Sequence, residues 1–584
     1  MPLDALYLHA LAGELTEKLR NGRIERIYHP LKDRVVLEIR HPYPGTNYQL
    51  LLSVHPQYAR IHLTESKMEN PAQPSAFCML LRKYLQGGRV LELTTKAWER
   101  IITMEVEVYA PDKGLCRRRL VLEAMGRRSN LLVLDTDNTI LDALRRSQKS
   151  SEREIFPGVL YVYPPVPTPL RPDLSEEALQ ALLDRVNSQR KLDEVLKTEL
   201  LGISPFLSKA WAYQAQFNPE QLVGDLPPDA GERLVHAFKT IEKKATQPEP
   251  GLILRSGSPV DFYLFSPEED PELNWQPVAD LNTAVERTLH HWDEEARRAA
   301  VQASLARLVR ERANKINKKL QKQAEELAAA EDAEIYRIQG ELLTVNMKSI
   351  TKGLSQVELP NYYDPENRPL LIPLRPDLSP AENSQYYYNK YQKAKKAKHA
   401  IAEQIRLNTE ELAYLEGILV TLADPLSHEE LGEIHSELST QGYIASRQVG
   451  SSKRQDVSSP RRFVSSDGTT IEVGRNNLQN DKLTFKIASP KDTWLHAQNI
   501  PGSHVLIRNN GQPVSDQTLL EAANLAVWYS KARTSTKVPV DYTPRRYVRK
   551  PPGSRPGFVL YDPFKTIIIT PDPSILSRLG VTTG

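Results

Sequence analysis

The chain has 584 residues, with 76 Lys or Arg and 73 Asp or Glu, which leaves a formal net charge of only +3. The length exceeds what one hydrophobic core supports, and the balanced charge excludes nucleic-acid binding through overall charge alone. With only two cysteines, no signal segment and no run of ~18 apolar residues, we expect a cytoplasmic protein without a disulfide framework or a membrane span.

Residues 1–169 are predicted to form a mixed α+β domain. Apolar residues recur at helical spacing over 6–19, which predicts a helix. Three segments have the β-branched, alternating pattern of strands: 35–40, 101–108 and 131–134. The proline-rich run at 164–169 ends the domain, because proline supplies no hydrogen-bond donor to a sheet.

Residues 170–284 have mainly helical apolar spacing, and the segment 201–207 is typical of a tight turn between two helices. Gly202 and the N-cap residue Ser204 would expose backbone amides in this turn, and such amides favour anions. The segment is therefore either a phosphate-binding hairpin or an ordinary helical turn.

Two seams of apolar residues predict a coiled coil with helices at 285–345 and 382–426. The seams are Val309, Ala313, Ile316, Leu320, Gln323, Leu327 and Ala330, and Tyr387, Tyr391, Ala394, Ile401, Ile405, Leu412, Leu415, Leu419 and Leu422. The simplest packing is an antiparallel arm of roughly 60–75 Å that carries a middle insert at 346–381. Lysines of the second helix, from Lys390 to Lys398, either contact phosphate or are merely solvated. The polar segment 427–462 is predicted to be a linker.

Residues 463–584 are predicted to form a second α+β domain, with strands at 469–474, 484–488 and 566–570 and a helix at 519–530. The run 492–505 combines Trp494, His496 and His504 with a Pro-Gly turn. A ring for stacking and imidazoles for hydrogen bonding favour RNA binding. For the histidines, metal ligation, acid–base catalysis and structural hydrogen bonds in a folded turn are the alternatives. Metal ranks low because no third ligand accompanies them, and a structural or an RNA-contacting role is favoured.

A loop at 531–555 is dense in positive charge. Its basic residues are Lys531, Arg533, Lys537, Arg545, Arg546, Arg549, Lys550 and Arg555. Asp541 is the one acid, and Tyr542 and Tyr547 are interleaved. Charge of one sign at this density costs self-repulsion unless an anion neutralises it, so the loop is predicted to bind RNA. A loop that only keeps the protein soluble is the alternative.

A second group of arginines lies in the first domain: Arg117, Arg118, Arg119, Arg127, Arg128, Arg145, Arg146 and Arg153. Nearby, Glu99 and Arg100 precede a predicted strand, where adjacent side chains point to opposite faces, so each is expected to need its own partner. The motifs GxxxxGK[ST], GxGxxG and GxSxG do not occur. We therefore expect a binding protein with no catalytic residue, cofactor or metal.

Motifs along nearly the whole chain are similar to those of one family. They lie at 55–60, 77–83, 87–88, 122–127, 340–343, 473–477, 492–496, 538–543 and 550–553. The sequence resembles the NFACT family, which includes bacterial RqcH-like and NEMF-like proteins of ribosome-associated quality control, some once labelled fibronectin-binding protein A homologues. The resemblance implies an α+β multidomain fold: a glycosylase-like N-terminal domain, a helix-hairpin-helix domain, the coiled-coil arm with its insert and a C-terminal NFACT-R domain.

The resemblance also implies a function. The protein would bind obstructed large (50S) ribosomal subunits that carry peptidyl-tRNA, contacting rRNA and ribosomal proteins near the stalk base. It would recruit alanine tRNA and promote template-free C-terminal alanine tailing of stalled chains for degradation, while the ribosome itself forms the peptide bond.

Site residues follow from the same resemblance. Those for tRNA are Asp4, Glu99, Arg100, Arg127 and Arg128, and the family's Asp-Arg pair falls on Glu99 and Arg100, where the acid is one methylene longer. Those for RNA in the C-terminal domain are Asp492, Trp494, His496, Gly502, Ser503, His504, Arg533, Asp541, Tyr542, Arg545, Arg546, Arg549, Lys550 and Arg555.

Two other functions remain as alternatives. A DNA glycosylase-like enzyme would use the amine of Pro2 after removal of Met1, but Leu3 stands where that enzyme pattern has a glutamate. A fibronectin-binding surface adhesin is suggested by the older family label, and it would need export from the cell.

Overall fold

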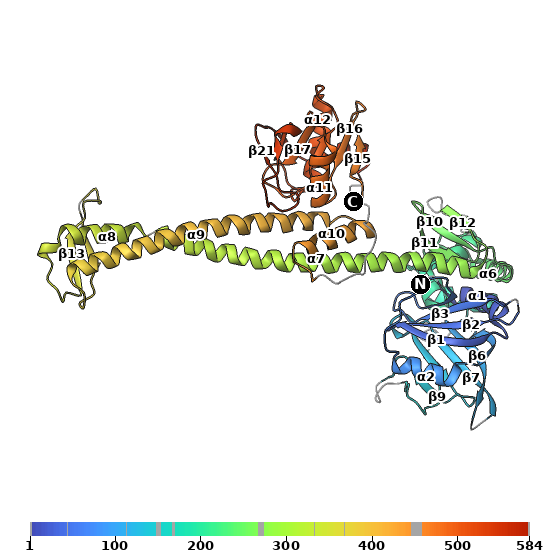
Figure 1. Ribbon diagram of the computed structural model, residues 1–584. Coiled ribbons are helices and arrows are strands. Elements are labelled where there is room, and N and C mark those ends of the chain that lie inside the picture. Colours follow the sequence, from blue (N-terminus) through green and yellow to red (C-terminus); the bar gives the residue numbers. More distant parts are fainter. Residues whose placement is uncertain are drawn as a thin grey trace. The chain divides into compact units, whose positions relative to one another are not determined.

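The computed structural model describes residues 3–43, 45–111, 114–147, 153–165, 170–266, 274–331, 333–366, 368–445 and 458–581 (Figure 1). These fall into two compact units, Met1–Glu295 and Ala296–Gly584. Among the residues described, none of the helices combines the length and apolarity that crossing a membrane requires.

A nine-stranded antiparallel sheet forms the centre of the first unit, in the order β4-β3-β2-β1-β5-β6-β7-β8-β9. Its strands are β1 (Arg23–Leu31), β2 (Arg34–Arg40), β3 (Asn47–Ser53), β4 (Arg60–Leu63), β5 (Arg89–Thr95), β6 (Ile101–Ala110), β7 (Gly114–Glu123), β8 (Asn130–Leu134) and β9 (Ile140–Ala143). The helices α1 (Ala5–Leu19) and α2 (Ala76–Leu85) pack on it. Along α1, Leu8, Leu11, Leu15 and Leu19 recur every three or four residues and are buried. The helix and strands predicted here are confirmed.

The helical segment that follows contains α3 (Glu176–Arg185), α4 (Leu192–Glu199), α5 (Pro205–Gln214) and α6 (Ala230–Thr246). The prediction of helix up to residue 280 is wrong in its last part, where a three-stranded sheet forms from β10 (Gly251–Arg255), β11 (Ser258–Tyr263) and β12 (Asn274–Pro277). Between β10 and β11, Ser256 and Gly257 both have positive φ, as a two-residue hairpin turn requires. This local turn, together with pairing to β12, overrides the helical spacing.

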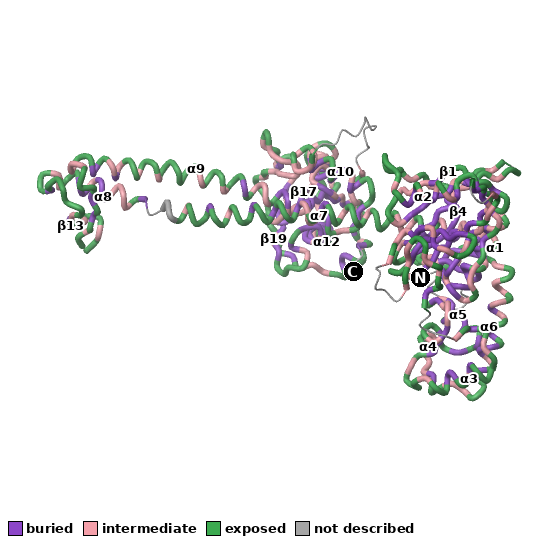
Figure 2. The backbone as a smooth tube through the Cα atoms, turned by 90° about the horizontal axis from the view of Figure 1, so that it is seen from below, coloured by how far each residue is buried: buried purple, intermediate pink, exposed green. Residues whose placement is uncertain are grey.

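The coiled-coil arm consists of α7 (Leu281–Glu331) and α9 (Pro380–Thr421), which lie side by side in both views (Figures 1 and 2). The pairing is antiparallel, because the Gln302 amide donates to the carbonyl oxygen of Leu422 at 2.9 Å while Asn408 donates to Gln323 at 2.7 Å. Val309, Ala313, Ile316, Leu415 and Ile418 share one buried core, which confirms the parts of the predicted seams from 309 to 320 and from 412 to 422. Tyr387 belongs to the core at the tip of the arm, and Ala330 lies outside the residues whose side chains are described.

The tip of the arm begins earlier than predicted. The first long helix ends at Glu331. After it, α8 (Glu334–Val345) packs against α9 and also shares a core with the hairpin of β13 (Gln356–Pro360) and β14 (Pro369–Pro373). Leu342 and Leu343 of α8 lie in one core with Leu359, Ile372 and Tyr387. The insert therefore includes the end of the segment that was assigned to the first coiled-coil helix.

The linker predicted at 427–462 contains a helix, α10 (His428–Thr440), so this prediction is wrong in its first part. Ser427 and Glu430 form a capping box at its start, and Leu431, Ile434 and Leu438 join the buried core of the arm. Residues 446–457 of the predicted linker lie outside the described residues.

The C-terminal domain is built on a six-stranded antiparallel sheet in the order β15-β16-β18-β17-β19-β22. Its strands are β15 (Arg461–Val464), β16 (Thr470–Val473), β17 (Thr493–Ala497), β18 (Val505–Ile507), β19 (Val538–Pro544) and β22 (Lys565–Ile569). Helix α12 (Asp516–Trp528) covers one face, and α13 (Pro573–Arg578) packs beside it. The short pair of β20 (Val548–Arg549) and β21 (Leu560–Tyr561) covers part of the other face.

One predicted strand of this domain is wrong. Residues 484–488 lie mostly in a π-helical turn, Leu483–Ile487, that continues α11 (Asn477–Lys482). The alternation of Thr484, Phe485 and Lys486 resembles a strand, but the Asn476 side chain caps α11 and the chain stays helical. The helix predicted at 519–530 and the strands predicted at 469–474 and 566–570 are confirmed.

Candidate nucleic-acid interface

Asp4 lies directly before α1 and is buried, with only 1% of its surface exposed. Its carboxylate accepts hydrogen bonds from the backbone N–H of Tyr7 at 2.8 Å and from the hydroxyls of Ser204 and Tyr263 at 2.7 Å each. Burial raises the pKa of Asp4, and these hydrogen bonds oppose the rise. One carboxylate thus joins α1, the start of α5 and the end of β11.

Glu99 and Arg100 occupy the turn before β6 and use different partners, as the sequence predicted. The Glu99 carboxylate, 7% exposed, accepts the Lys96 ammonium at 2.6 Å, and its second oxygen has no hydrogen-bond partner among the described residues. Burial lowers the pKa of Arg100, while the negative charge of Asp4 opposes this change. Asp4, Glu99 and Arg100 are therefore brought to one region of the first unit.

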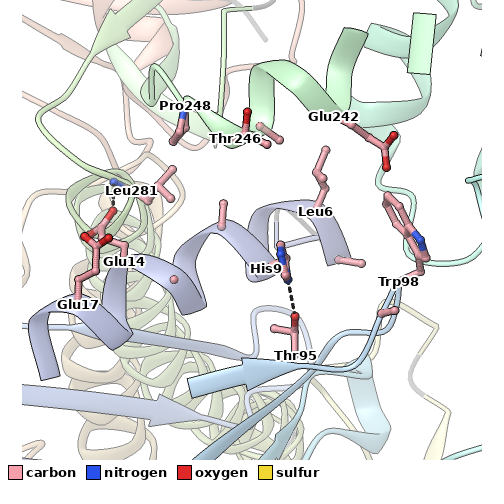
Figure 3. A pocket seen from close by; sticks show the side chains of 15 residues that line it. Leu6, His9, Glu14, Glu17, Thr95, Trp98, Glu242, Thr246, Pro248 and Leu281 are labelled. Atoms are coloured by element: carbon pink, nitrogen blue, oxygen red, sulfur yellow. Dashed lines mark hydrogen bonds between the residues drawn. The ribbon is translucent and has the colours of Figure 1, made fainter. Parts of the chain in front are cut away.

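A groove of about 690 Å³ lies in the same region, between α1, the turn at Trp98 and the end of α6. Figure 3 shows Glu242 beside Trp98 at one end, Glu14 and Glu17 at the other, and His9 between them. Burial raises the pKa of Glu242. None of the described residues that line the groove is Lys or Arg, so it suits a neutral or cationic group better than a phosphate.

The turn at Gly202 packs against the N-terminal domain. The Gly202 carbonyl oxygen accepts the Ala5 N–H at 3.1 Å, and a Cβ at Gly202, whose φ is +72°, would lie 2.4 Å from the Trp98 carbonyl oxygen. Ser204 is buried and caps α5 by accepting the Leu207 N–H. These contacts support the ordinary helical turn over a phosphate-binding hairpin.

Arg127 and Arg128 lie on an exposed single turn, Gly126–Arg128, that a neighbouring arginine fixes in place. The Arg145 guanidinium donates to the carbonyl oxygens of Ser129, Val54 and Arg127 at 3.0–3.2 Å. In the described part of this unit, neither Arg127 nor Arg128 forms an ion pair. Other arginines of the group are paired: Arg117 with Glu105, Arg118 with Asp135, Arg146 with Asp142 and Arg153 with Glu123.

Trp494 is fully buried, so it does not form the stacking surface that the sequence suggested. It points between the sheet and the β20–β21 pair, where it packs with Leu483, Leu506 and Val548. This burial depends on residues more than 50 positions away in the sequence, such as Val548, which local pattern does not reveal. The prediction that Trp494 offers a ring to RNA is therefore corrected.

Other predicted RNA residues of the run 492–505 also form contacts within the domain. His504 is buried, its Nδ1 lies 2.7 Å from the Thr484 hydroxyl, and burial lowers its pKa to about 3. Asp492 accepts hydrogen bonds from the backbone N–H groups of Ser489 and Asn510.

The Pro-Gly turn of the same run packs closely on Ser530. Gly502 makes this close packing possible, since a Cβ at that position would lie 2.7 Å from the Ser530 side chain. The backbone N–H of Ser503 donates to the carbonyl oxygen of Tyr529. His496, half-buried, stacks on Trp494, and burial lowers its pKa.

Asp541, the one acid of the basic loop, faces inward. It is 1% exposed and accepts the hydroxyls of Tyr561 at 2.8 Å and Thr566 at 2.6 Å and the Gln498 amide at 3.1 Å. Tyr542, its neighbour, packs partly buried on the α12 side of the sheet. No group of three His, Cys, Asp or Glu able to hold a metal occurs among the described residues.

Three of the eight basic residues of the loop are bound by carboxylates of the arm. Lys531 pairs with Glu416 at 2.6 Å, Arg533 with Asp424 at 2.6 Å and Arg555 with Glu411 at 3.5 Å. Next to them, Arg475, Asn476 and Asn477 bind Glu430, Glu433 and Glu437 of α10. Carboxylates of the arm therefore neutralise part of the positive charge of the basic loop. The sequence did not predict this role of the arm.

The rest of the loop faces solvent or its own domain. The Arg545 Nε donates to the Thr484 carbonyl oxygen at 2.5 Å, and Lys550 pairs with Asp481. Arg546 and Arg549 are exposed and form no ion pair with any described residue. Together with Lys537 of the same loop, which is also exposed and has no ion pair among the described residues, these two remain available to an external anion.

Comparison with known proteins gives the following likenesses. The NFACT N-terminal and middle domains match residues 4–457, and the NFACT protein RNA binding domain matches residues 460–559. Proteins named Rqc2 homolog RqcH are 34% identical in Bacillus subtilis (strain 168) and 35% identical in Streptococcus pneumoniae (strain D39), each over 99% of this chain and 100% of the relative. The solved C-terminal part of the fibronectin/fibrinogen-binding protein from Streptococcus suis is 35% identical and covers 48% of this chain and 99% of that one, with a TM-score of 0.39.

Proposed function

The chain belongs to the NFACT family, and from this premise we propose that it is an RNA-binding factor of ribosome-associated quality control. The observation that carries the proposal is the match of the whole chain to proteins named Rqc2 homolog RqcH. It is supported by exposed, unpaired arginines in each unit, Arg127 and Arg128 in the first and Arg546 and Arg549 in the second.

In finer terms, we propose that the protein works in the cytoplasm on obstructed large ribosomal subunits that carry peptidyl-tRNA. It recruits alanine tRNA and promotes template-free alanine tailing of the stalled chain. The protein supplies binding and positioning, and the ribosome forms the peptide bond. In keeping with this division, the sequence contains neither the GxxxxGK[ST] phosphate loop nor the GxSxG nucleophile motif.

The tRNA site is proposed to lie where Asp4, Glu99 and Arg100 converge. Trp98 offers an aromatic wall to the adjacent groove, and Glu242 and His9 offer hydrogen-bonding groups. A groove without Lys or Arg suits an unpaired base better than the backbone of the tRNA. Arg127 and Arg128, exposed on their fixed turn, supply phosphate contacts.

Two finer assignments of fold belong to the same proposal. The first unit combines a glycosylase-like domain with a helix-hairpin-helix domain, and the tight turn between α4 and α5 at Gly202 supports the second of these. Catalysis by a glycosylase is not proposed, because Leu3 occupies the position of the glutamate and is buried.

The test is to isolate the tagged protein from cells, sediment it through a gradient and sequence the RNA that travels with it. Enrichment of large-subunit rRNA with one dominant tRNA is the expected result, and that tRNA names the amino acid of the tail. Free protein that sediments without rRNA or tRNA would overturn the proposal.

A further inference from the structure

We propose that the C-terminal domain binds unpaired RNA on one defined surface, made by Arg546, Arg549, Leu560, Phe564 and Ile568. We call these five residues the outer surface. The inference rests on the proposed RNA binding of this domain, and it assigns that binding to a surface different from the one that carries most of the family motif.

The edge strand β22 forms one side of the outer surface. Ile567 and Ile569 pack toward the core under α12, so Ile568, between them, points to the opposite face of the sheet. Ile568 lies opposite Pro539 and is 69% exposed. The face that α12 leaves uncovered is therefore open to solvent at this edge.

The β20–β21 pair forms the next part. Arg549 lies directly opposite Leu560, so the two side chains share one face. Leu560 is 46% exposed and Phe564 is 45% exposed, and the Phe564 ring lies 5.4 Å from that of Tyr561. Because the Tyr561 hydroxyl donates to the buried Asp541, this aromatic pair is held in place from below.

The positive charge comes from Arg546, in the turn Arg545–Tyr547, and from Arg549 of β20. The backbone N–H of Arg546 donates to the Pro490 carbonyl oxygen at 3.0 Å, and the guanidinium lies 4.9 Å from the centre of the Tyr547 ring. Arg546 and Arg549 are exposed and form no ion pair in the described part of the chain. Asp562 is the acid of the run 560–565, so the outer surface keeps a net positive charge.

The side chains of the outer surface indicate which ligand it binds. Exposed apolar and aromatic groups beside free guanidiniums fit bases that stack and phosphates that pair with cations. Duplex RNA hides the faces of its bases, so unpaired nucleotides gain most from Phe564. The opposite side of the domain, where Lys531, Arg533 and Arg461 meet carboxylates of the arm, has its charge already neutralised.

The experiment measures binding of the full-length protein to a labelled single-stranded RNA and to a hairpin of the same composition, over a series of salt concentrations. Three variants are compared with the wild type. R546A/R549A removes two cations of the outer surface, F564A removes its ring, and R461A/K531A removes the same amount of charge from the side that faces the arm.

The wild type is expected to prefer the single strand. R546A/R549A should reduce the slope of log affinity against log salt by about 1.4, since each phosphate contact to a single strand contributes about 0.7. F564A should weaken binding at least about fivefold at an unchanged slope, the effect of about 1 kcal/mol of stacking. R461A/K531A should leave affinity and slope as they are.

Four results overturn the inference: a loss of slope in R461A/K531A but not in R546A/R549A, an unchanged slope in R546A/R549A, an unchanged affinity in F564A, or a preference of the wild type for the hairpin. In each case the protein still binds RNA and the proposed function stands. A wild type that binds neither RNA would contradict the proposed RNA binding itself.

Discussion

Asp4 of the first unit and the basic loop at 531–555 of the C-terminal domain differ in which groups bind their charges. Asp4, an acid expected to contact tRNA, is enclosed by hydroxyls and a backbone amide of its own unit. The basic loop is divided, with Lys531 and Arg533 bound to the arm and Arg546 and Arg549 left in solvent. The comparison teaches that residue type predicts the chemistry available, whereas burial decides whether that chemistry is turned toward a ligand or toward the fold.

The largest expected effect tests the N-terminal side of this comparison. Asp4→Ala leaves the hydroxyls of Ser204 and Tyr263 without their acceptor, and we expect the first unit to lose about 3 kcal/mol of stability. Hydrogen exchange at α1 and α5 in the full-length protein measures the loss. Ser204→Ala removes one of these donors and also the N-cap of α5, so it should cost about 2 kcal/mol. Normal protection in Asp4→Ala with abolished tRNA binding would instead make Asp4 a direct contact.

The second effect concerns the contact between α10 and the C-terminal domain. Burial raises the pKa of Glu437 to about 7 from its ordinary value of 4.5. Between these values the native state holds a proton that the unfolded chain has released, so stability falls as the pH rises through this window and then levels off. Urea unfolding from about pH 4 to about pH 8, values that bracket this window, should show this decline.

Glu437→Gln provides the matched variant. Its neutral amide can still accept the Asn477 hydrogen bond, so the decline should vanish and stability at pH 8 should rise by up to about 3 kcal/mol. An equal pH dependence in both proteins would show that the pKa of Glu437 is not raised in the folded state.

The third effect tests whether arm carboxylates hold the basic loop. Asp424 binds Arg533 at 2.6 Å and Arg461 at 3.3 Å, and these groups are partly exposed, so we expect about 1 kcal/mol from the Asp424–Arg533 pair. A double-mutant cycle with Asp424→Asn and Arg533→Met, read by hydrogen exchange at β15 and α12, gives the coupling. Strictly additive effects would mean that the pair contributes nothing.

The smallest effect on stability is expected for the exposed turn of the first unit. Arg127→Ala with Arg128→Ala should change unfolding by less than about 0.5 kcal/mol, because neither side chain is buried or ion-paired within the described residues. The salt slope of tRNA binding should fall by about 1 for each arginine that contacts phosphate. An unchanged slope would remove this turn from the tRNA site.

Elements set by local periodicity could be predicted from the sequence. The seams of the arm follow from steps of three and four residues, and the helix at the N-terminus follows from its leucine spacing. Helix α10 could have been found from the capping box of Ser427 and Glu430 and the spacing of Leu431, Ile434 and Leu438. The sheet at 251–277 was not predicted, because its local signal is limited to the two-residue turn at Ser256 and Gly257.

The state of the site residues could not be predicted, because it depends on contacts between distant segments. Arg533 and Asp424 are 109 residues apart in the sequence, and Asp541 is bound by the hydroxyl of Tyr561, a residue of β21. The run 492–505 contains groups typical of an RNA site, yet Trp494 and His504 lie inside. The residue types were recognised correctly, but their direction is a property of the tertiary fold.

The most direct test of the account is ultraviolet crosslinking of the full-length protein bound to large ribosomal subunits and tRNA, with mass spectrometry of the crosslinked peptides. We predict crosslinks in the peptides that carry Arg127, Arg128 and residues 545–568. Peptides that carry Trp494, His504 and Lys531 should be free of them. Crosslinks concentrated on Trp494 and Lys531, with none at residues 545–568, would contradict the account.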